Sequence, residues 1–371
     1  MIRHAVRGAL ALILITAVMY TAGLGQPATQ MRIVFRDAKT GAEKTIDAED
    51  LKATPGGYQA IVGGKVSATI SPEDIVRVDP GEAALAPLER GAVLGQFKME
   101  QDAQKDASNW EKARVIYLDM QKKVKGSGAK PAVSQFIEYR IAYTTAKVAD
   151  NTADDGWDEK AKAAQQMLND YLISYPTGWE VWQASRTRCR MLLELGNPGE
   201  AAATWAKTAK NASIPAYLQR EALLEEIDAL FRAKQFPEVQ DRVDKFPKAD
   251  ATGPIKDRLA IYQAASKLAQ GPKPPEGPMT LWLKPLQDMV DAAKDPVTRA
   301  VGYNVIGEVC MFVDRPREAM WAYLWVEVVY NHDRNEVAKA MFRLVKSFES
   351  QQDEERAKSY KDKVRRYRAS L

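Results

Sequence analysis

The chain has few of the side chains on which most catalytic and metal sites depend. Its 371 residues include two cysteines and two histidines. The sequence contains no G-x-S-x-G, H-E-x-x-H or C-x-x-C motif, no Walker loop and no dinucleotide glycine fingerprint. It therefore lacks the common nucleophile, zinc and phosphate-binding patterns. We expect no catalytic residue, no cofactor and no metal, and His332 is interpreted as a solvated histidine in a short connector.

The two cysteines are also too few for the disulfide framework that holds small exported proteins together. Cys189 and Cys310 each stand among apolar residues of an expected helix. We expect both to be small buried hydrophobic residues. A bridge between them is the alternative, and it would require contact between distant parts of the chain.

A strong excess of one charge is missing as well. The chain carries 53 basic and 49 acidic residues, a formal net charge of +4. Without residues 1–25 the charge falls to +2, because Arg3 and Arg7 leave and no acid does. A balance this close to neutral gives no general reason to expect nucleic acid as a partner.

The longest apolar run near the start is short. Ala9–Tyr20 holds 12 residues, whereas an α-helix needs roughly 20 to cross a bilayer. Basic residues precede this run and small residues follow it, which is the pattern of a secretory signal peptide. We predict a signal peptide over 1–25, a periplasmic or secreted protein, and no membrane span after its removal. An uncleaved N-terminal anchor is the alternative.

Residues 26–80 have the pattern of a small β domain. Five short segments are rich in β-branched or alternating residues: Met31–Phe35, Thr45–Ile46, Tyr58–Val62, Lys65–Ile70 and Ile75–Val78. Gly63-Gly64 suits a two-residue hairpin turn, and Ser71–Asp74 suits one helical turn. The order resembles the SH3-like or Sm-like five-stranded β-barrels. No aromatic binding platform accompanies the resemblance, so we expect a capping or docking module.

The rest of the chain is predicted to be helical, with a connecting helical region over 81–107 and a repeat domain over 108–371. A small residue recurs where the second helix of each repeat begins: Ala113, Ala164, Ala201, Val239, Ala319 and Ala357. The 80 residues between Val239 and Ala319 amount to two periods, so a further unit is expected there. We place its two helices at Asp257–Gln270 and Thr280–Ala293.

These repeats resemble the tetratricopeptide repeat family. The clearest unit matches the family pattern at Tyr303, Ile306, Gly307, Ala319 and Tyr323, although Cys310 replaces its second aromatic residue. Weaker units contribute Ala201, Trp205, Ala164 and Pro176. The resemblance covers about residues 100–371 and implies a mainly α protein, an α-solenoid of five or six helical hairpins. The matching residues are expected to pack the repeats, and so are most of the tryptophans.

In this family, the first helix of each hairpin lines a concave surface that holds a protein or peptide. The resemblance therefore implies a non-enzymatic scaffold, with partner-binding residues at exposed first-helix positions such as Arg186, Arg190, Asn304 and Glu308. The ligand and the oligomeric state stay open.

Two other functions remain possible. One is binding of a polyanion or cell-wall polymer by the basic C-terminal helix, which begins with acids and ends with bases, as the helix dipole favours. Its bases are Lys358, Lys361, Lys363, Arg365, Arg366 and Arg368. The other is an envelope hydrolase that uses paired carboxylates such as Glu225 and Asp228, which share a helix face.

Overall fold

The computed structural model describes residues 31–81, 85, 88–129, 131–152, 154–272, 274 and 279–370. The protein is mainly helical with a small β part in front, as the sequence predicts. The expected signal peptide over 1–25 lies outside the described residues. Among the helices that are described, none combines the length and apolar character needed to cross a membrane.

The β part forms two antiparallel three-stranded sheets, with strand orders β2-β1-β6 and β3-β4-β5. The strands are β1 (Met31–Arg36), β2 (Glu43–Ala48), β3 (Asp50–Thr54), β4 (Gly57–Val62), β5 (Lys65–Ile70) and β6 (Ile75–Asp79). The five-strand expectation missed β3, because only Glu49 separates it from β2 where the chain passes between sheets. The expected Gly63-Gly64 turn joins β4 to β5, and both glycines have positive φ.

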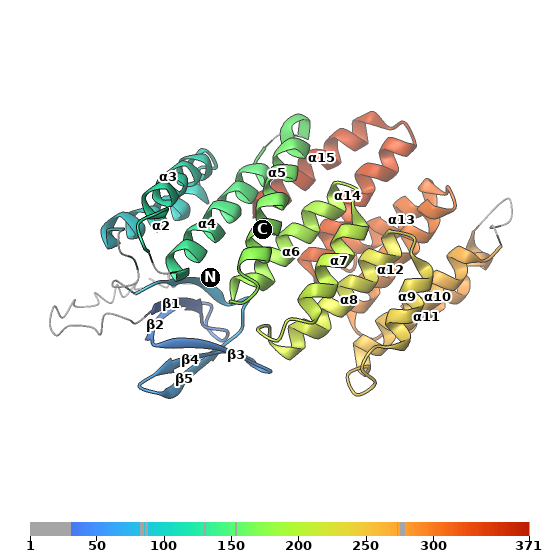
Figure 1. Ribbon diagram of the computed structural model, residues 1–371. Helices are drawn as coiled ribbons and strands as arrows, with labels where there is room; N and C mark the ends of the chain where they lie inside the picture. Colours follow the sequence, from blue (N-terminus) through green and yellow to red (C-terminus); the bar gives the residue numbers. More distant parts are fainter. Residues whose placement is uncertain are drawn as a thin grey trace, which may run out of the picture.

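The helices follow one another as packed neighbours along the chain. They are α2 (Arg90–Ala103), α3 (Ser108–Val124), α4 (Pro131–Asp150), α5 (Asp154–Ser174), α6 (Glu180–Glu194), α7 (Pro198–Ala209), α8 (Ala216–Arg232), α9 (Phe236–Asp244), α10 (Gly253–Gln270), α11 (Thr280–Ala292), α12 (Pro296–Phe312), α13 (Pro316–Val328), α14 (Arg334–Ser350) and α15 (Glu354–Ser370). Within the described residues they pair into seven hairpins, from α2/α3 to α14/α15 (Figure 1). The expectation of five or six was too low, because α2 of the connecting region pairs with α3.

The small residues that mark the repeat lie in the core. All six register positions from Ala113 to Ala357 are at most 4% exposed. Four of them are the fourth residue of their helix, and Leu283 holds the same place in α11. The unit expected from spacing alone therefore exists as α10 and α11, and its signature alanine is replaced by a buried leucine.

One glycine shows why the repeat needs small residues. A Cβ atom at Gly307 of α12 would overlap the ring of Tyr323 of α13. Tyr323 is itself only 1% exposed, so the ring has no free space to enter. The two helices reach this spacing because one of them has no side chain at the contact.

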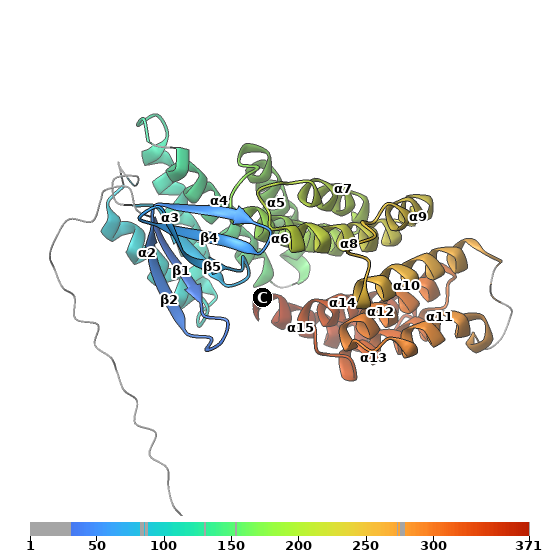
Figure 2. The same cartoon turned by 90° about the horizontal axis from the view of Figure 1, so that it is seen from below.

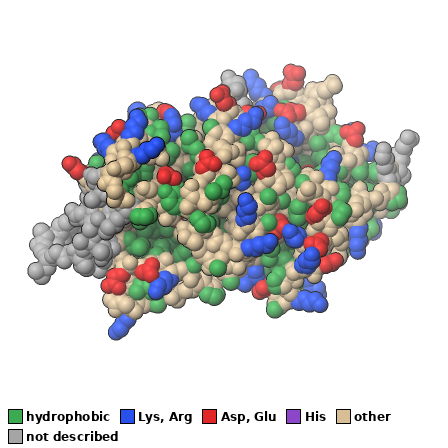
Figure 3. Space-filling model, in the orientation of Figure 1, with side chains coloured by type: hydrophobic (Ala, Val, Ile, Leu, Met, Phe, Trp, Pro, Cys, Tyr) green, Lys and Arg blue, Asp and Glu red, His purple; other side chains and the backbone are tan. Residues whose placement is uncertain are grey.

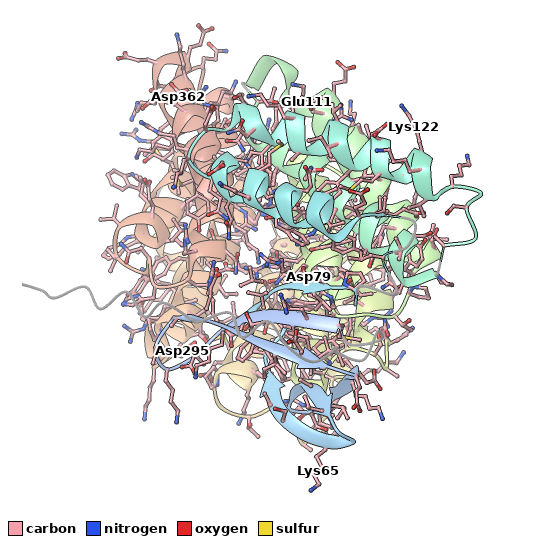
Figure 4. The ribbon with its side chains drawn as sticks, turned by 90° about the vertical axis from the view of Figure 1, so that its left-hand side faces the viewer. Lys65, Asp79, Glu111, Lys122, Asp295 and Asp362 are labelled. Atoms are coloured by element: carbon pink, nitrogen blue, oxygen red, sulfur yellow. The ribbon has the colours of Figure 1, made fainter. Side chains whose placement is uncertain are left out.

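The β part packs onto the helices as one unit with them. Ile33, Tyr58 and Ile70 share a hydrophobic core with Tyr139 of α4 and Trp179 before α6. The Tyr58 hydroxyl lies 3.1 Å from the carbonyl oxygen of Gly178 and 2.9 Å from that of Ser213. Figure 4 shows the sheets below α3 and α4, with Asp79 at the helix side and Lys65 at the far tip.

The helical array folds back on itself between α9 and α10 (Figure 2). It therefore has a first arm, which consists of α2 to α9, and a second arm, which consists of α10 to α15. The even-numbered helices α6 and α8 of one arm face α10, α12 and α14 of the other, while α7 and α13 lie outside. At the end of the chain, Arg368 of α15 donates to Glu194 of α6 over 2.6 Å. The guanidinium also covers the Trp157 ring of α5 at 3.9 Å. The inner face is therefore enclosed by the chain itself.

Candidate functional site

The four residues predicted to bind a partner lie on this inner face and contact other parts of the chain. Arg190 donates to Asp150 over 2.7 Å, and Arg186 donates to Asn335 over 2.5 Å. Asn304 is 2% exposed and donates to Glu336. The Glu308 side chain is 15% exposed and lies 2.5 Å from Arg343. The expectation that these positions are exposed is wrong, because each side chain contacts another helix of the array, and Arg186 does so across the two arms.

A polar network fills the space between the arms. We define it by Glu225, Asp228, Arg232, Tyr262, Asn304, Glu308, Glu336, Lys339 and Arg343. Lys339 of α14 is its centre, 2.8 Å from Glu336, 3.1 Å from Glu225 and 3.4 Å from Asp228. The Tyr262 hydroxyl donates to Asp228 over 2.9 Å. Four carboxylates thus meet three cations in a largely buried place, where pairing is required for stability.

Within the network, the two carboxylates that the hydrolase alternative would use have their pKa values shifted in opposite directions. Burial raises the pKa of Glu225 to about 7, with help from the neighbouring Asp228. Burial also acts to raise the pKa of Asp228, but Lys339 and Arg232 outweigh it and hold that pKa below its usual range. Two carboxyl groups whose pKa values differ in this way can act as the acid and the base of a catalysed reaction. Here Lys339 contacts both carboxylates, and Asp228 is 5% exposed. We therefore interpret Glu225 and Asp228 as members of the polar network that joins the two arms.

Most bases of the C-terminal helix are also engaged. Lys361 pairs with Glu349, Lys363 with Glu327, Arg365 with Asp362 and Arg368 with Glu194. Lys358 and Arg366 are exposed. A polyanion would therefore meet a helix whose charge is largely balanced by its neighbours.

The residues predicted to pack the repeat are buried, with one exception. Tyr303, Ile306, Gly307, Ala319, Tyr323, Ala201, Trp205 and Ala164 are all buried. Pro176 was expected among them, but it is exposed in the connection between α5 and α6. Cys189 and Cys310 are free and buried, and His332 is exposed, as expected. Within the described ranges, no group of His, Cys, Asp and Glu is arranged to hold a metal.

An exposed aromatic face on α13 was not predicted from the sequence. Trp321 is 59% exposed, Trp325 46% and Val328 67%. Because their spacing is i, i+4 and i+7, they form one stripe on the helix. With Val329 and Tyr330, which follow the stripe, they make up what we call the α13 aromatic face. The spacing was visible in the sequence, but tryptophans in repeats were expected to be packing residues.

The α13 aromatic face is supported from beneath by α12. The rings of Tyr303 and Trp325 stack with centroids 5.8 Å apart, and those of Tyr303 and Tyr330 with centroids 5.4 Å apart. The Tyr303 hydroxyl donates to Asp291 of α11 over 2.8 Å. These contacts hold the rings in place before any partner arrives, which lowers the entropy cost of binding.

No family model matches the chain, and no curated protein matches it. Its buried carboxylates are held by cations of the same chain, while its most exposed aromatic residues stand on an ordered surface. Tryptophan and tyrosine are the residue types that dominate binding energy at protein interfaces.

Proposed function

We propose that the protein is a non-catalytic scaffold of tetratricopeptide-like helical hairpins that binds a partner protein. The proposal includes export, which rests on the signal-peptide pattern of residues 1–25. The observation that carries it is the exposed Trp321–Val328 stripe above the Tyr303 stack. Contiguous exposed apolar patches mark interaction sites, whereas single exposed apolar side chains do not, and Trp321 belongs to such a stripe with Trp325 and Val328.

The partner is expected to offer an apolar segment that covers Trp321 and Val328. The binding surface therefore lies on an outer helix, whereas the family resemblance alone would place it on the first helix of each hairpin. A partner on the inner face would have to displace the contacts of Arg190 and Lys339 with buried carboxylates. Breaking such pairs costs several kcal/mol each.

The test uses a photocrosslinking residue at position 321, with position 115 of α3 as the matched site. Val115 is 53% exposed and belongs to a different part of the surface. A partner captured only from position 321 is then purified, and its binding to the full chain is measured by calorimetry. We expect Val328→Asp and Trp321→Ala to weaken this binding at least about tenfold, since hot-spot truncations cost 2 kcal/mol or more. Val115→Asp should leave it unchanged.

Two outcomes would overturn the proposal. One is equal loss of binding in Val328→Asp and Val115→Asp. The other is a purified protein whose only partner at this face is a second copy of itself, detected as a dimer that Val328→Asp dissociates in sedimentation.

A further inference from the structure

A pocket opens on the outer surface of the first arm, between α5 and α7, and α6 forms its floor. Its volume is about 390 Å³, within the range of sites for small organic ligands. Residues of all three helices and of the connections after α5 and α7 line it: Asn169, Leu172, Ile173, Pro176, Thr177, Val181, Ser185, Arg188, Thr204, Lys207, Thr208, Lys210, Asn211 and Ala212. Figure 3 shows Lys and Arg side chains gathered near the middle of this face.

Arg188 on the floor is a buried cation with incomplete pairing. It is 9% exposed, and its Nε has no hydrogen-bond partner among the described residues. One terminal nitrogen donates to the hydroxyl of Thr204. The other lies 3.5 Å from Glu200, whose side chain is 61% exposed and strongly solvated. A buried guanidinium whose carboxylate partner is long and solvent-exposed is only partly compensated, and a second anion would stabilise it further.

The rest of the pocket lining also favours a negatively charged ligand. Lys207 and Lys210 add two exposed cations on the α7 side, and the lining residues include no Asp or Glu. Burial lowers the pKa of Arg188, which is the direction expected where a cation is poorly compensated. The hydroxyl groups of Ser185 and Thr208, which also line the pocket, lie 2.9 Å apart.

The opposite wall is apolar. Leu172 and Ile173 at the end of α5 and Val181 near the start of α6 line it, and Ile173 is 67% exposed. A ligand that satisfied both walls would carry a negative head and an apolar body. A cation would be repelled by three positive charges, and a neutral molecule would add no negative charge beside Arg188.

We propose that this pocket binds a small organic acid, with its carboxylate or phosphate monoester at Arg188, Lys207 and Lys210 and its apolar body against Leu172 and Val181. The two head groups share the chemistry that a guanidinium recognises. The site is separate from the α13 aromatic face, so its test stands apart from that of the scaffold proposal.

The experiment measures binding of four six-carbon probes to the full chain by calorimetry at low salt. The probes are hexanoate, hexyl phosphate, 1-hexanol and hexylammonium. We expect one of the two anions to bind at least roughly tenfold more tightly than both the alcohol and the amine, because charge-assisted contacts add more than 1.4 kcal/mol. The preferred anion tells which head group the pocket takes. Equal binding of all four probes, or no binding of either anion at about 10 mM, would overturn the proposal.

Variants then locate the site. Lys207→Gln combined with Lys210→Gln should weaken anion binding about tenfold. Ala212→Trp, at an exposed lining position, should block the pocket and abolish binding without touching the core. Arg188→Gln should also abolish it, provided that the melting temperature shows a folded protein. Lys122→Gln is the matched control, because Lys122 is exposed on α3 and points away from the array (Figure 4). Anion binding that survives Ala212→Trp would place the site elsewhere and refute the assignment.

Discussion

Lys339 of α14 places its ammonium group 3.1 Å from the carboxylate of Glu225 on α8, although 114 positions separate them in the chain. The contact joins the two arms of the folded array. Since Lys339 also reaches Asp228 and Glu336, one cation serves three carboxylates. This side chain therefore makes a central contribution to holding the two arms together.

Lys339→Met should destabilise the protein strongly. The methionine keeps most of the volume, but Asp228 and Glu225 then lose their common cation in a largely buried place. Removing one partner of a buried pair typically costs about 3–5 kcal/mol. Urea unfolding followed by circular dichroism measures the loss. Lys346→Met on the same helix is the control: its side chain is 56% exposed, and it should change stability by less than about 0.5 kcal/mol. Equal effects of the two variants would contradict the central role of Lys339.

Gly307→Ala should destabilise the array through overpacking. The added methyl group meets the buried Tyr323 ring, so α12 and α13 must separate or the ring must leave its position. Such changes cost about 1–3 kcal/mol, measured as a lower midpoint of thermal unfolding.

The matched control for that substitution is Gly95→Ala in the middle of α2. Nothing lies within 4 Å of a Cβ atom placed there. Alanine favours a helix over glycine by about 0.5–1 kcal/mol, so this variant should be neutral or more stable. A stabilised Gly307→Ala protein would show that the close approach of Gly307 to Tyr323 is not required.

Local spacing predicted much of the fold because each helical hairpin is built from contacts close in sequence. The alanines and Gly307 leave a regular mark, since a helix pair can approach only where side chains are small. The same regularity placed α10 and α11, where Leu283 hides the signature. Strand β3 was not predicted because the chain passes from β2 to β3 through a bend at Glu49, which leaves no turn pattern in the sequence.

The sites were harder to predict because they depend on contacts between distant residues. Nothing in the repeat pattern predicts that α12 lies close to α8 of the other arm, so Glu308 is expected to be exposed, although its side chain is 15% exposed and lies 3.6 Å from Arg232. The pocket at Arg188 forms where α5 and α7 diverge, which no periodicity records. The exposed side of Trp321 was encoded in its spacing from Trp325, but the same spacing also fits a packed stripe.

Glu180 should make stability depend on pH. It is 8% exposed at the start of α6, and burial raises its pKa to about 7. A carboxyl group with a pKa above its unfolded value of 4.5 stabilises the fold fully below that value. This contribution is lost as pH rises through about 7. Glu180→Gln cannot ionise, so the wild type should lose stability relative to this variant between pH 5 and 8.

The measurement is the difference in unfolding free energy between wild type and Glu180→Gln at several pH values. Using the difference removes the contribution of other groups, including Glu225, whose pKa is also raised to about 7. Glu159→Gln, at an exposed position of α5, is the control substitution. A flat difference for Glu180→Gln would show that its carboxyl group is as well solvated as it is in the unfolded chain.

Arg368→Ala should loosen the end of the array. The guanidinium joins α15 to Glu194 of α6 and covers the Trp157 ring of α5, so its loss removes both of these contacts of α15 with the first arm. Among the described residues, Glu194 would keep the partner it has in Arg190, 3.3 Å away. Hydrogen exchange should therefore accelerate in α15, with little change in α3, which lies far along the chain. Arg366→Ala on the same helix is the control, because Arg366 is exposed. If both variants exchanged at the wild-type rate, the remaining packing of α15 would be enough to hold the helix, and the Arg368 contacts would not contribute to its stability.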